Sequence, residues 1–206
     1  MKCGKPVASG GEEYCDDCRK YVHKFERGVA AFTYTGSLRG SVYRMKTQNR
    51  RDYLEFFGQE MVRALQPVLR MWNPQLLVPV PMHPKKKRRR GYNQAELLAE
   101  EIHRLTGIPV ERSLVRCIRQ NTDQKMLDRR KRKKNLEGSF LAVRNLPEEV
   151  TRVLIVDDVY TTGSTVDEIA AVLCRAGAKK IFFVVLCTGK GKKTVCTEKK
   201  LCYNEG

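Results

Sequence analysis

Long apolar runs are absent from this sequence. No segment approaches the roughly 18 consecutive apolar residues that a membrane-spanning helix needs, and the first residues lack the apolar core of a secretory signal. Internal repeats are absent as well. We therefore expect a cytoplasmic protein without a membrane span.

Regular cysteine spacing is also missing. Eight cysteines are scattered irregularly over 206 residues, which is not the pattern of a disulfide framework; in a reducing compartment they would serve as thiols or metal ligands. Cys15 and Cys18 form a C-x₂-C pair, and Cys3 lies 12 residues before Cys15. Four-cysteine zinc sites typically use two such pairs, so these three residues are candidate ligands of Zn²⁺. A C-x₂-C pair without metal is the alternative.

Acidic residues are scarce relative to basic ones. Forty Lys and Arg oppose 23 Asp and Glu, which gives a formal net charge of +17. Much of the excess lies in two runs of six cations, at residues 85–90 and 129–134. The first run consists of Lys85, Lys86, Lys87, Arg88, Arg89 and Arg90. Such clusters favour contact with a polyanion, namely pyrophosphate, nucleic acid or both. Solvated loops that only raise the isoelectric point are the alternative.

The most informative segment is VLIVDDVYTTGST at residues 153–165. Four apolar strand formers lead into two adjacent carboxylates, Asp157 and Asp158. A turn rich in hydroxyls follows, made of Thr161, Thr162, Gly163, Ser164 and Thr165. Acids at the end of a strand can meet ribose hydroxyls or a metal, and the turn with the next helix N-terminus can hold a phosphate. The segment predicts a sugar-phosphate site; a buried strand and capped turn without a ligand is the alternative.

Hydrophobic periodicity around this segment predicts a parallel sheet. Val166, Ile169, Ala170 and Leu173 have the spacing of a buried helical stripe. The apolar run at residues 181–186 then predicts a second buried strand. A strand, a helix and a strand in this order favour parallel pairing with a right-handed crossover. We expect an earlier strand at residues 76–80.

VLIVDDVYTTGST closely resembles the phosphoribosyl diphosphate (PRPP) signature of type I phosphoribosyltransferases. Three further regions resemble the ComF (competence protein F) family, and they follow one another in that family's order. They are FTYTGSLRGSVYRMKTQ at 32–48, LLVPVPMHPKKKRRRGYNQAELLAEEI at 76–102, and QNTDQKML with NLEGSF within 120–140. The resemblance covers nearly the whole chain. The PRPP signature alone indicates the superfamily, and the other segments make ComF specific.

The resemblance implies an α/β protein of the type I phosphoribosyltransferase fold. This is a mostly parallel twisted sheet flanked by helices, with a small, truncated, zinc-ribbon-like module rich in cysteine at the N-terminus. We expect this module at residues 1–26, the phosphoribosyltransferase-like domain at 27–188 and a basic, flexible tail at 189–206.

The resemblance also implies roles for the motif residues. Thr161 to Thr165 would cradle the 5-phosphate of PRPP, and Asp157 and Asp158, the expected catalytic residues, would bond the ribose hydroxyls. Mg²⁺ would be held chiefly by the pyrophosphate of the ligand and by water. A loop from Val80 to Arg90 would grip the pyrophosphate, and a flexible loop at 119–140, with Asn121, Thr122 and Gln124, would close over the site.

Two functions of different classes remain open at this point. The first is Mg²⁺-dependent transfer of ribose-5-phosphate from PRPP to an unknown acceptor, in a protein that its family links to DNA uptake in natural competence. The second is a non-catalytic module of the competence machinery that binds single-stranded DNA or a phosphoribosyl ligand. A sensor in which PRPP controls a partner is a third. PRPP, single-stranded DNA and other competence proteins are the expected partners.

The fourth zinc ligand is open too. ComF proteins usually carry two cysteine pairs at this position, and Cys3-Gly4-Lys5-Pro6 resembles the end of the first pair. The missing cysteine would then precede Met1, which implies that the chain starts late. In the alternative, His23 completes a Cys₃His site.

Overall fold

The computed structural model describes residues 2–6, 14–48, 51–119 and 136–189. Several predicted features lie outside these ranges: the basic run at 129–134, the residues Asn121, Thr122 and Gln124, and the tail beyond Gly189. In the described part of the chain, every helix is too short or too polar to cross a bilayer.

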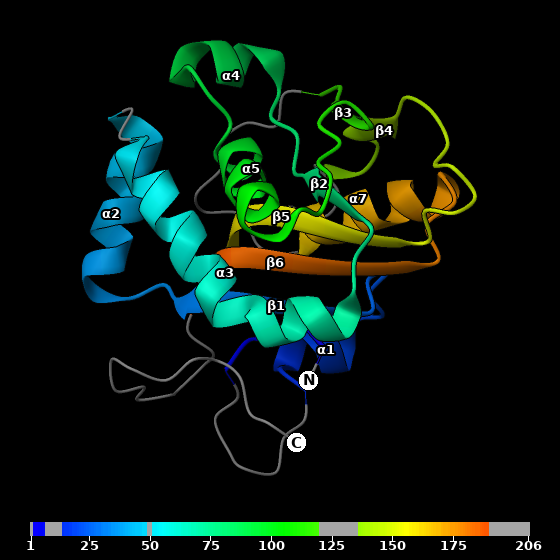
Figure 1. The fold of residues 1–206 in the computed structure, drawn as a ribbon, viewed down its shortest axis with the longest axis horizontal. Helices are drawn as coiled ribbons and strands as arrows, with labels where there is room; N and C mark the ends of the chain where they lie inside the picture. The colour runs from blue at the N-terminus through cyan, green and yellow to red at the C-terminus, as the bar shows by residue number, and fades with distance from the viewer. Residues whose placement is uncertain (1, 7–13, 49–50, 120–135, 190–206) are drawn as a thin grey trace.

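A four-stranded parallel sheet forms the centre of the fold (Figure 1). Its order is β1 (Arg27–Thr33), β6 (Lys180–Thr188), β5 (Arg152–Tyr160) and β2 (Leu76–Pro79), and each neighbouring pair is parallel. A parallel bridge from Leu77 to Val110 extends the sheet beyond β2. The predicted α/β architecture with a mostly parallel sheet is therefore confirmed.

Helices and a small hairpin complete the described structure. The helices are α1 (Asp16–Lys20), α2 (Gly36–Thr47), α3 (Asp52–Trp72), α4 (Pro84–Arg90), α5 (Gln94–Thr106) and α7 (Ser164–Arg175). The strands β3 (Val115–Cys117) and β4 (Phe140–Ala142) pair antiparallel in a separate sheet.

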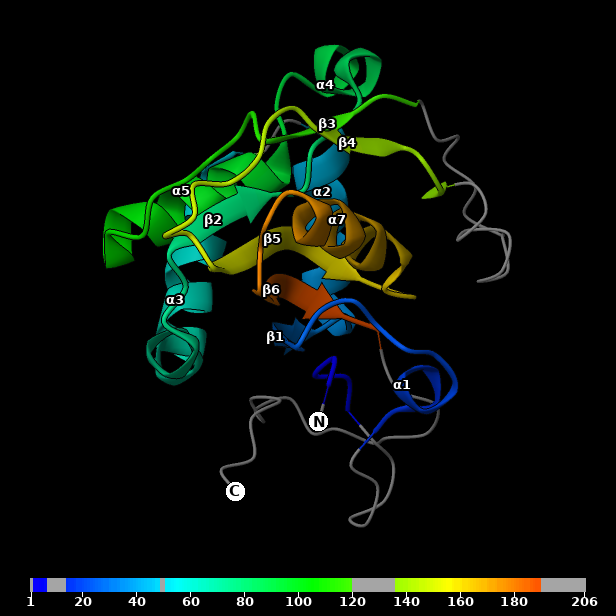
Figure 2. The same cartoon turned by 90° about the vertical axis from the view of Figure 1, so that its right-hand side faces the viewer.

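The sheet is buried on both faces, which explains the continuous apolar runs of β5 and β6. Leu154 and Val156 of β5 pack in one apolar cluster with α3 and α5, whereas Val153 and Ile155 pack in a second cluster with α7. Successive strand residues thus serve opposite faces, as the pleat requires. Figure 2 shows the sheet between α3 and α5 on one side and α7 on the other.

Two segments differ from the prediction. Strand β5 continues through Asp157 and Asp158 to Tyr160, because β6 pairs with it in register as far as Thr188. The run at residues 84–90, expected in a loop, forms helix α4 instead. Pro84 starts this helix, the His83 side chain accepts a hydrogen bond from Lys85 N, and Gly91 ends it at φ 86°. Lys and Arg are good helix formers, so no residue between those ends opposes the helix.

The described N-terminal residues pack against the α/β core. Cys3 and Phe25 belong to the same apolar cluster as Tyr160 and Phe183. Lys2 accepts a backbone hydrogen bond from Gly28 N at 2.7 Å. The boundary at residue 26 stays a prediction, since β1 begins at Arg27 while the cysteine segment shares this core.

Candidate functional site

The connections that follow β2 and β5 run toward opposite sides of the sheet. From β5 the chain passes through α7 to β6, whereas from β2 it passes through α5 to the Val110 segment on the opposite side. Ligands of open parallel sheets bind outside the carboxyl ends of the strands at such a switch point, because the two connections diverge there and leave a crevice. The topology therefore predicts the binding site at the ends of β2 and β5.

A cavity of about 1020 Å³ lies at this position. Its walls come from the end of α2, the β2–α4 connection, α4, the start of α5, the β3–β4 hairpin and the end of β5. The lining residues are Tyr43, Lys46, Thr47, Val80, Pro81, Met82, His83, Lys86, Arg88, Arg89, Arg90, Gly91, Asn93, Gln94, Ala95, Cys117, Leu136, Phe140, Asp157, Asp158 and Thr165. The cavity is large enough for a ligand of drug size or above.

Asp157 and Asp158 both line this cavity. Lys46, from the last turn of α2, places its Nζ 2.6 Å from Asp158 Oδ2. Burial, and then the charge of Asp158, raises the pKa of Asp157 above its usual range. Burial acts to lower the pKa of Lys46, but the Asp158 carboxylate outweighs it and the net shift is upward. Two acids and one cation thus share a partly desolvated site.

The hydroxyl-rich turn lies beside the acids at the start of α7. Thr165 lines the cavity, whereas Thr161, Thr162, Gly163 and Ser164 are not among the lining residues. The Thr162 and Ser164 hydroxyls bond one another at 3.0 Å. Gly163 has a φ of 79°, and an added Cβ would meet Tyr160 Cζ at 2.9 Å, so the turn needs glycine on two counts. The 12-residue helix α7 begins directly after Gly163, so its partially positive N-terminus lies at this turn.

Helix α4 forms the cationic wall. Lys86, Arg88, Arg89 and Arg90 line the cavity, but Lys85 and Lys87 do not. Lys87 instead forms an ion pair with Glu96 at 2.7 Å. Of the six predicted cations, four are therefore placed to contact a ligand in the cavity and two are not.

Lys46, Tyr43 and Gln94 are among the lining residues that sequence reasoning missed. Lys46 and Tyr43 belong to α2, far from the acids in sequence, and no local pattern marks them. Gln94 is buried at the start of α5, and its Oε1 accepts a hydrogen bond from Arg90 at 2.7 Å. Its Nε2 is buried without a hydrogen-bond partner among the described residues. A buried amide donor of this kind is costly unless a ligand satisfies it.

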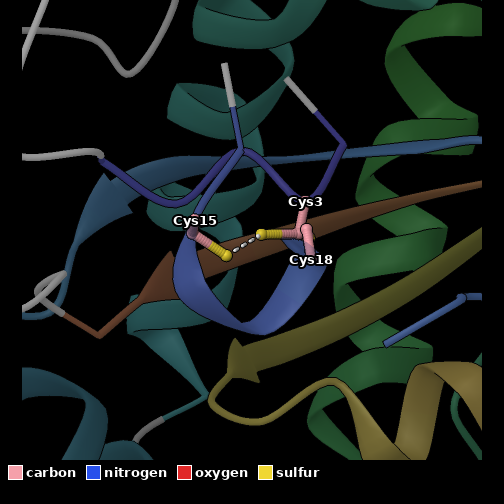
Figure 3. Close-up of side chains that lie close together, drawn as sticks. All are labelled: Cys3, Cys15 and Cys18. Atoms are coloured by element: carbon pink, nitrogen blue, oxygen red, sulfur yellow. Dashed lines mark hydrogen bonds between the residues drawn. The ribbon is translucent and has the colours of Figure 1, made fainter. Parts of the chain in front are cut away.

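The three predicted zinc residues form a compact cluster (Figure 3). The Sγ atoms of Cys3, Cys15 and Cys18 all lie within 4.8 Å of one another, and Cys3 Sγ lies 3.3 Å from Cys15 Sγ. A hydrogen bond from Cys18 lowers the pKa of Cys15, whereas the bond to Cys15 raises the pKa of Cys3 to about 11. Three sulfur donors grouped this closely suit a soft metal ion such as Zn²⁺.

His23 does not join this cluster in the structure. Its Nδ1 lies 2.6 Å from Asp167 Oδ2, and its ring stacks on Phe25 with centroids 4.7 Å apart. Asp167 stands in the first turn of α7. The histidine therefore links the cysteine segment to the helix that follows the hydroxyl-rich turn.

Comparison with known proteins defines the class. The phosphoribosyl transferase domain family matches residues 88–203. Competence protein F of Haemophilus influenzae is 31% identical over 173 residues, which cover 82% of this chain and 76% of that protein. DNA utilization protein YhgH of Salmonella typhimurium is 31% identical over 189 residues, covering 90% and 82%. A purine phosphoribosyltransferase structure from Pyrococcus horikoshii is similar at 16% identity and a TM-score of 0.39, covering 70% of this chain and 95% of that one. The chain is a phosphoribosyltransferase-like protein, and it belongs to the ComF family.

Proposed function

We propose that the cavity binds PRPP with Mg²⁺ and that the protein transfers ribose-5-phosphate to an acceptor. One observation carries the proposal: an acid pair, Thr165 in the first turn of α7 and four cations of α4 line the same cavity. A phosphorylated sugar with a pyrophosphate at its other end has matching chemistry at each of these three places.

The ribosyl phosphate end fits the acid pair and the start of α7. The N-terminus of α7 carries unsatisfied N–H groups and a partial positive charge, which suit the 5-phosphate. Asp157 and Asp158 are suited to accept hydrogen bonds from the ribose hydroxyls, since ionised carboxylates are strong acceptors. The two carboxylates fit as indirect supports for Mg²⁺, which favours oxygen ligands and keeps several waters.

The pyrophosphate end fits the cations of α4. Lys86, Arg88 and Arg90 line the cavity, and the buried amide of Gln94 offers a donor there. When the bond from the anomeric carbon to pyrophosphate breaks, its electron pair leaves with the pyrophosphate, and these cations stabilise the growing charge. Mg²⁺, when bound, adds further charge neutralisation at the leaving group. The sugar carbon passes through an oxocarbenium-like state, and an acceptor nucleophile forms the new bond from the opposite face.

Removing the lining cations of α4 should weaken pyrophosphate binding selectively. We expect Lys86→Gln with Arg88→Gln to raise the Kd for Mg²⁺-pyrophosphate about a hundredfold or more, because each of the two lost charged hydrogen bonds costs about 1.5–3 kcal/mol. The matched control is Lys85→Gln with Lys87→Gln, which removes two cations of the same helix that do not line the cavity. Calorimetric titration measures both. Equal losses in the two variants would show that only net charge matters.

Single-stranded DNA binding is a second candidate, favoured by one side chain. Tyr43 is 57% exposed and lines the same cavity as the cations of α4, so an aromatic stacking surface lies beside a basic one. We expect Tyr43→Ala to weaken binding of single-stranded DNA severalfold, with the salt dependence unchanged, because stacking carries no charge. A steeper or shallower salt slope in this variant would speak against a stacking role.

We propose in addition that Cys3, Cys15 and Cys18 bind Zn²⁺, which their sulfur donors and close grouping suit. The described residues supply only these three ligands, so we expect substoichiometric zinc in the purified chain, measured by elemental analysis. Cys15→Ser should remove it, whereas Cys174→Ser, at an exposed cysteine, should not. His23→Ala should leave zinc unchanged, since the described cluster of possible ligand atoms contains the three sulfurs and neither ring nitrogen of His23. Loss of zinc in that variant would identify His23 as the fourth ligand.

A further inference from the structure

Lys46 reaches the acid pair from a helix far away in the sequence. It lies in the last turn of α2, and the match to the phosphoribosyl transferase domain begins only at residue 88. Its Nζ lies 2.6 Å from Asp158 Oδ2, and both residues line the cavity. The chain thus adds to the acid pair a cation that the VLIVDDVYTTGST motif does not contain.

The backbone around Lys46 is held by the segment that joins α4 to α5. The Tyr92 hydroxyl donates a hydrogen bond to the backbone carbonyl of Met45, the residue before Lys46. Tyr92 and Met45 are both buried. Above the Tyr92 ring, the Arg51 guanidinium lies 5.1 Å from the ring centroid. The hydrogen bond from Tyr92 holds the backbone next to Lys46 in place. The Lys46 side chain itself is long, flexible and 30% exposed, so its ammonium can reach a different partner.

The Asp158 carboxylate has little room for two kinds of partner at once. Its side chain is only 13% exposed, and the Lys46 ammonium already contacts one of its oxygens. A largely buried carboxylate needs a partner at all times, because an unpaired charge there is strongly unfavourable. A hydroxyl donor that approaches Oδ2 competes with the ammonium for this oxygen, and an ammonium that gives way in turn needs an anion nearby.

We infer that Lys46 exchanges partners when a phosphoribosyl ligand binds: it leaves Asp158 to the ribose hydroxyls and binds the pyrophosphate end of the same ligand. The inference rests on the proposed function and goes further in naming a binding residue outside its motif. The exchange keeps both the acid and the ammonium paired throughout, so neither is left as an isolated charge. Lys46 also shields the acid pair while no sugar occupies it.

Titrating the two halves of the ligand separately tests this exchange. Ribose-5-phosphate carries only the hydroxyls and the phosphate, whereas Mg²⁺-pyrophosphate carries only the leaving group. In Lys46→Met, which keeps the length but loses the charge, we expect pyrophosphate affinity to fall about tenfold and ribose-5-phosphate affinity to rise severalfold, because the sugar no longer displaces an ammonium. Lys46→Arg, which keeps the charge, should retain most of the pyrophosphate affinity.

Lys180→Met is the matched control, since it makes the same exchange at an exposed position at the start of β6 and Lys180 does not line the cavity. It should bind both halves as the unchanged protein does. A parallel loss of both affinities in Lys46→Met would mean that Lys46 only supports the structure, and unchanged affinities would mean that it does not contact the ligand. Failure of the unchanged protein to bind ribose-5-phosphate would instead overturn the phosphoribosyl site itself.

Discussion

Replacing both acids, as Asp157→Asn with Asp158→Asn, should abolish PRPP binding while the chain keeps its fold. Each carboxylate that accepts a ribose hydroxyl contributes about 1.5–3 kcal/mol as a charged hydrogen bond, so losing both raises the Kd by about a hundredfold or more. The amides have the size of the acids, and the two residues are only partly buried, so the strand β5 should pair with β6 as before. Calorimetry measures the affinity, and thermal unfolding checks the fold.

A second pair of adjacent aspartates provides the control. Asp16→Asn with Asp17→Asn makes the same chemical change in α1, away from the cavity lining. This variant should bind PRPP as the unchanged protein does. Unaltered PRPP affinity in the Asp157 and Asp158 variant would show that the acids do not hold the ribose.

Gly163→Ala should destabilise the protein and weaken ribose-5-phosphate binding together. The residue has a φ of 79°, where a side chain costs about 1–2 kcal/mol, and its Cβ would meet the buried ring of Tyr160, with Cζ at 2.9 Å. Overpacking of this kind adds about 1–3 kcal/mol. Because the added Cβ pushes against the buried Tyr160 ring, the turn should be displaced from its geometry and the Kd for ribose-5-phosphate should rise about tenfold or more.

Gly107→Ala separates the backbone cost of a positive φ from the steric cost of the contact with Tyr160. Gly107 has a nearly equal φ of 75°, but an added Cβ would meet nothing within 4 Å. We expect Gly107→Ala to lower the free energy of unfolding by the backbone cost alone, about 1–2 kcal/mol. Its ribose-5-phosphate affinity should not change. If denaturant unfolding gave equal losses for both variants, contact with Tyr160 would not matter.

The sheet could be predicted from sequence because its strands are buried on both faces. Residues 153–156 and 181–186 are unbroken apolar runs, which a parallel strand between two helical layers requires. The acid pair followed from position alone, since residues that come directly after a buried run lie at the carboxyl edge of the sheet.

The remaining parts of the site depend on contacts between distant segments. Lys46 reaches Asp158 only because α2 folds over the end of β5, and the two residues are 112 positions apart in a chain of 206. Helix α4 was missed because a run of cations has no hydrophobic periodicity, so only its ends, Pro84 and Gly91, indicate a helix. Likewise, nothing in the sequence distinguishes the cations of α4 that line the cavity from Lys87, which forms an ion pair with Glu96 of α5.

The most direct test of the PRPP site is a calorimetric titration of the unchanged protein with PRPP and Mg²⁺, repeated in the presence of single-stranded DNA. We predict saturable binding of one PRPP per chain, with a lower apparent affinity when DNA is present, because the cations of α4 and the acid pair line the same cavity. The absence of saturable PRPP binding at any Mg²⁺ concentration would contradict the account.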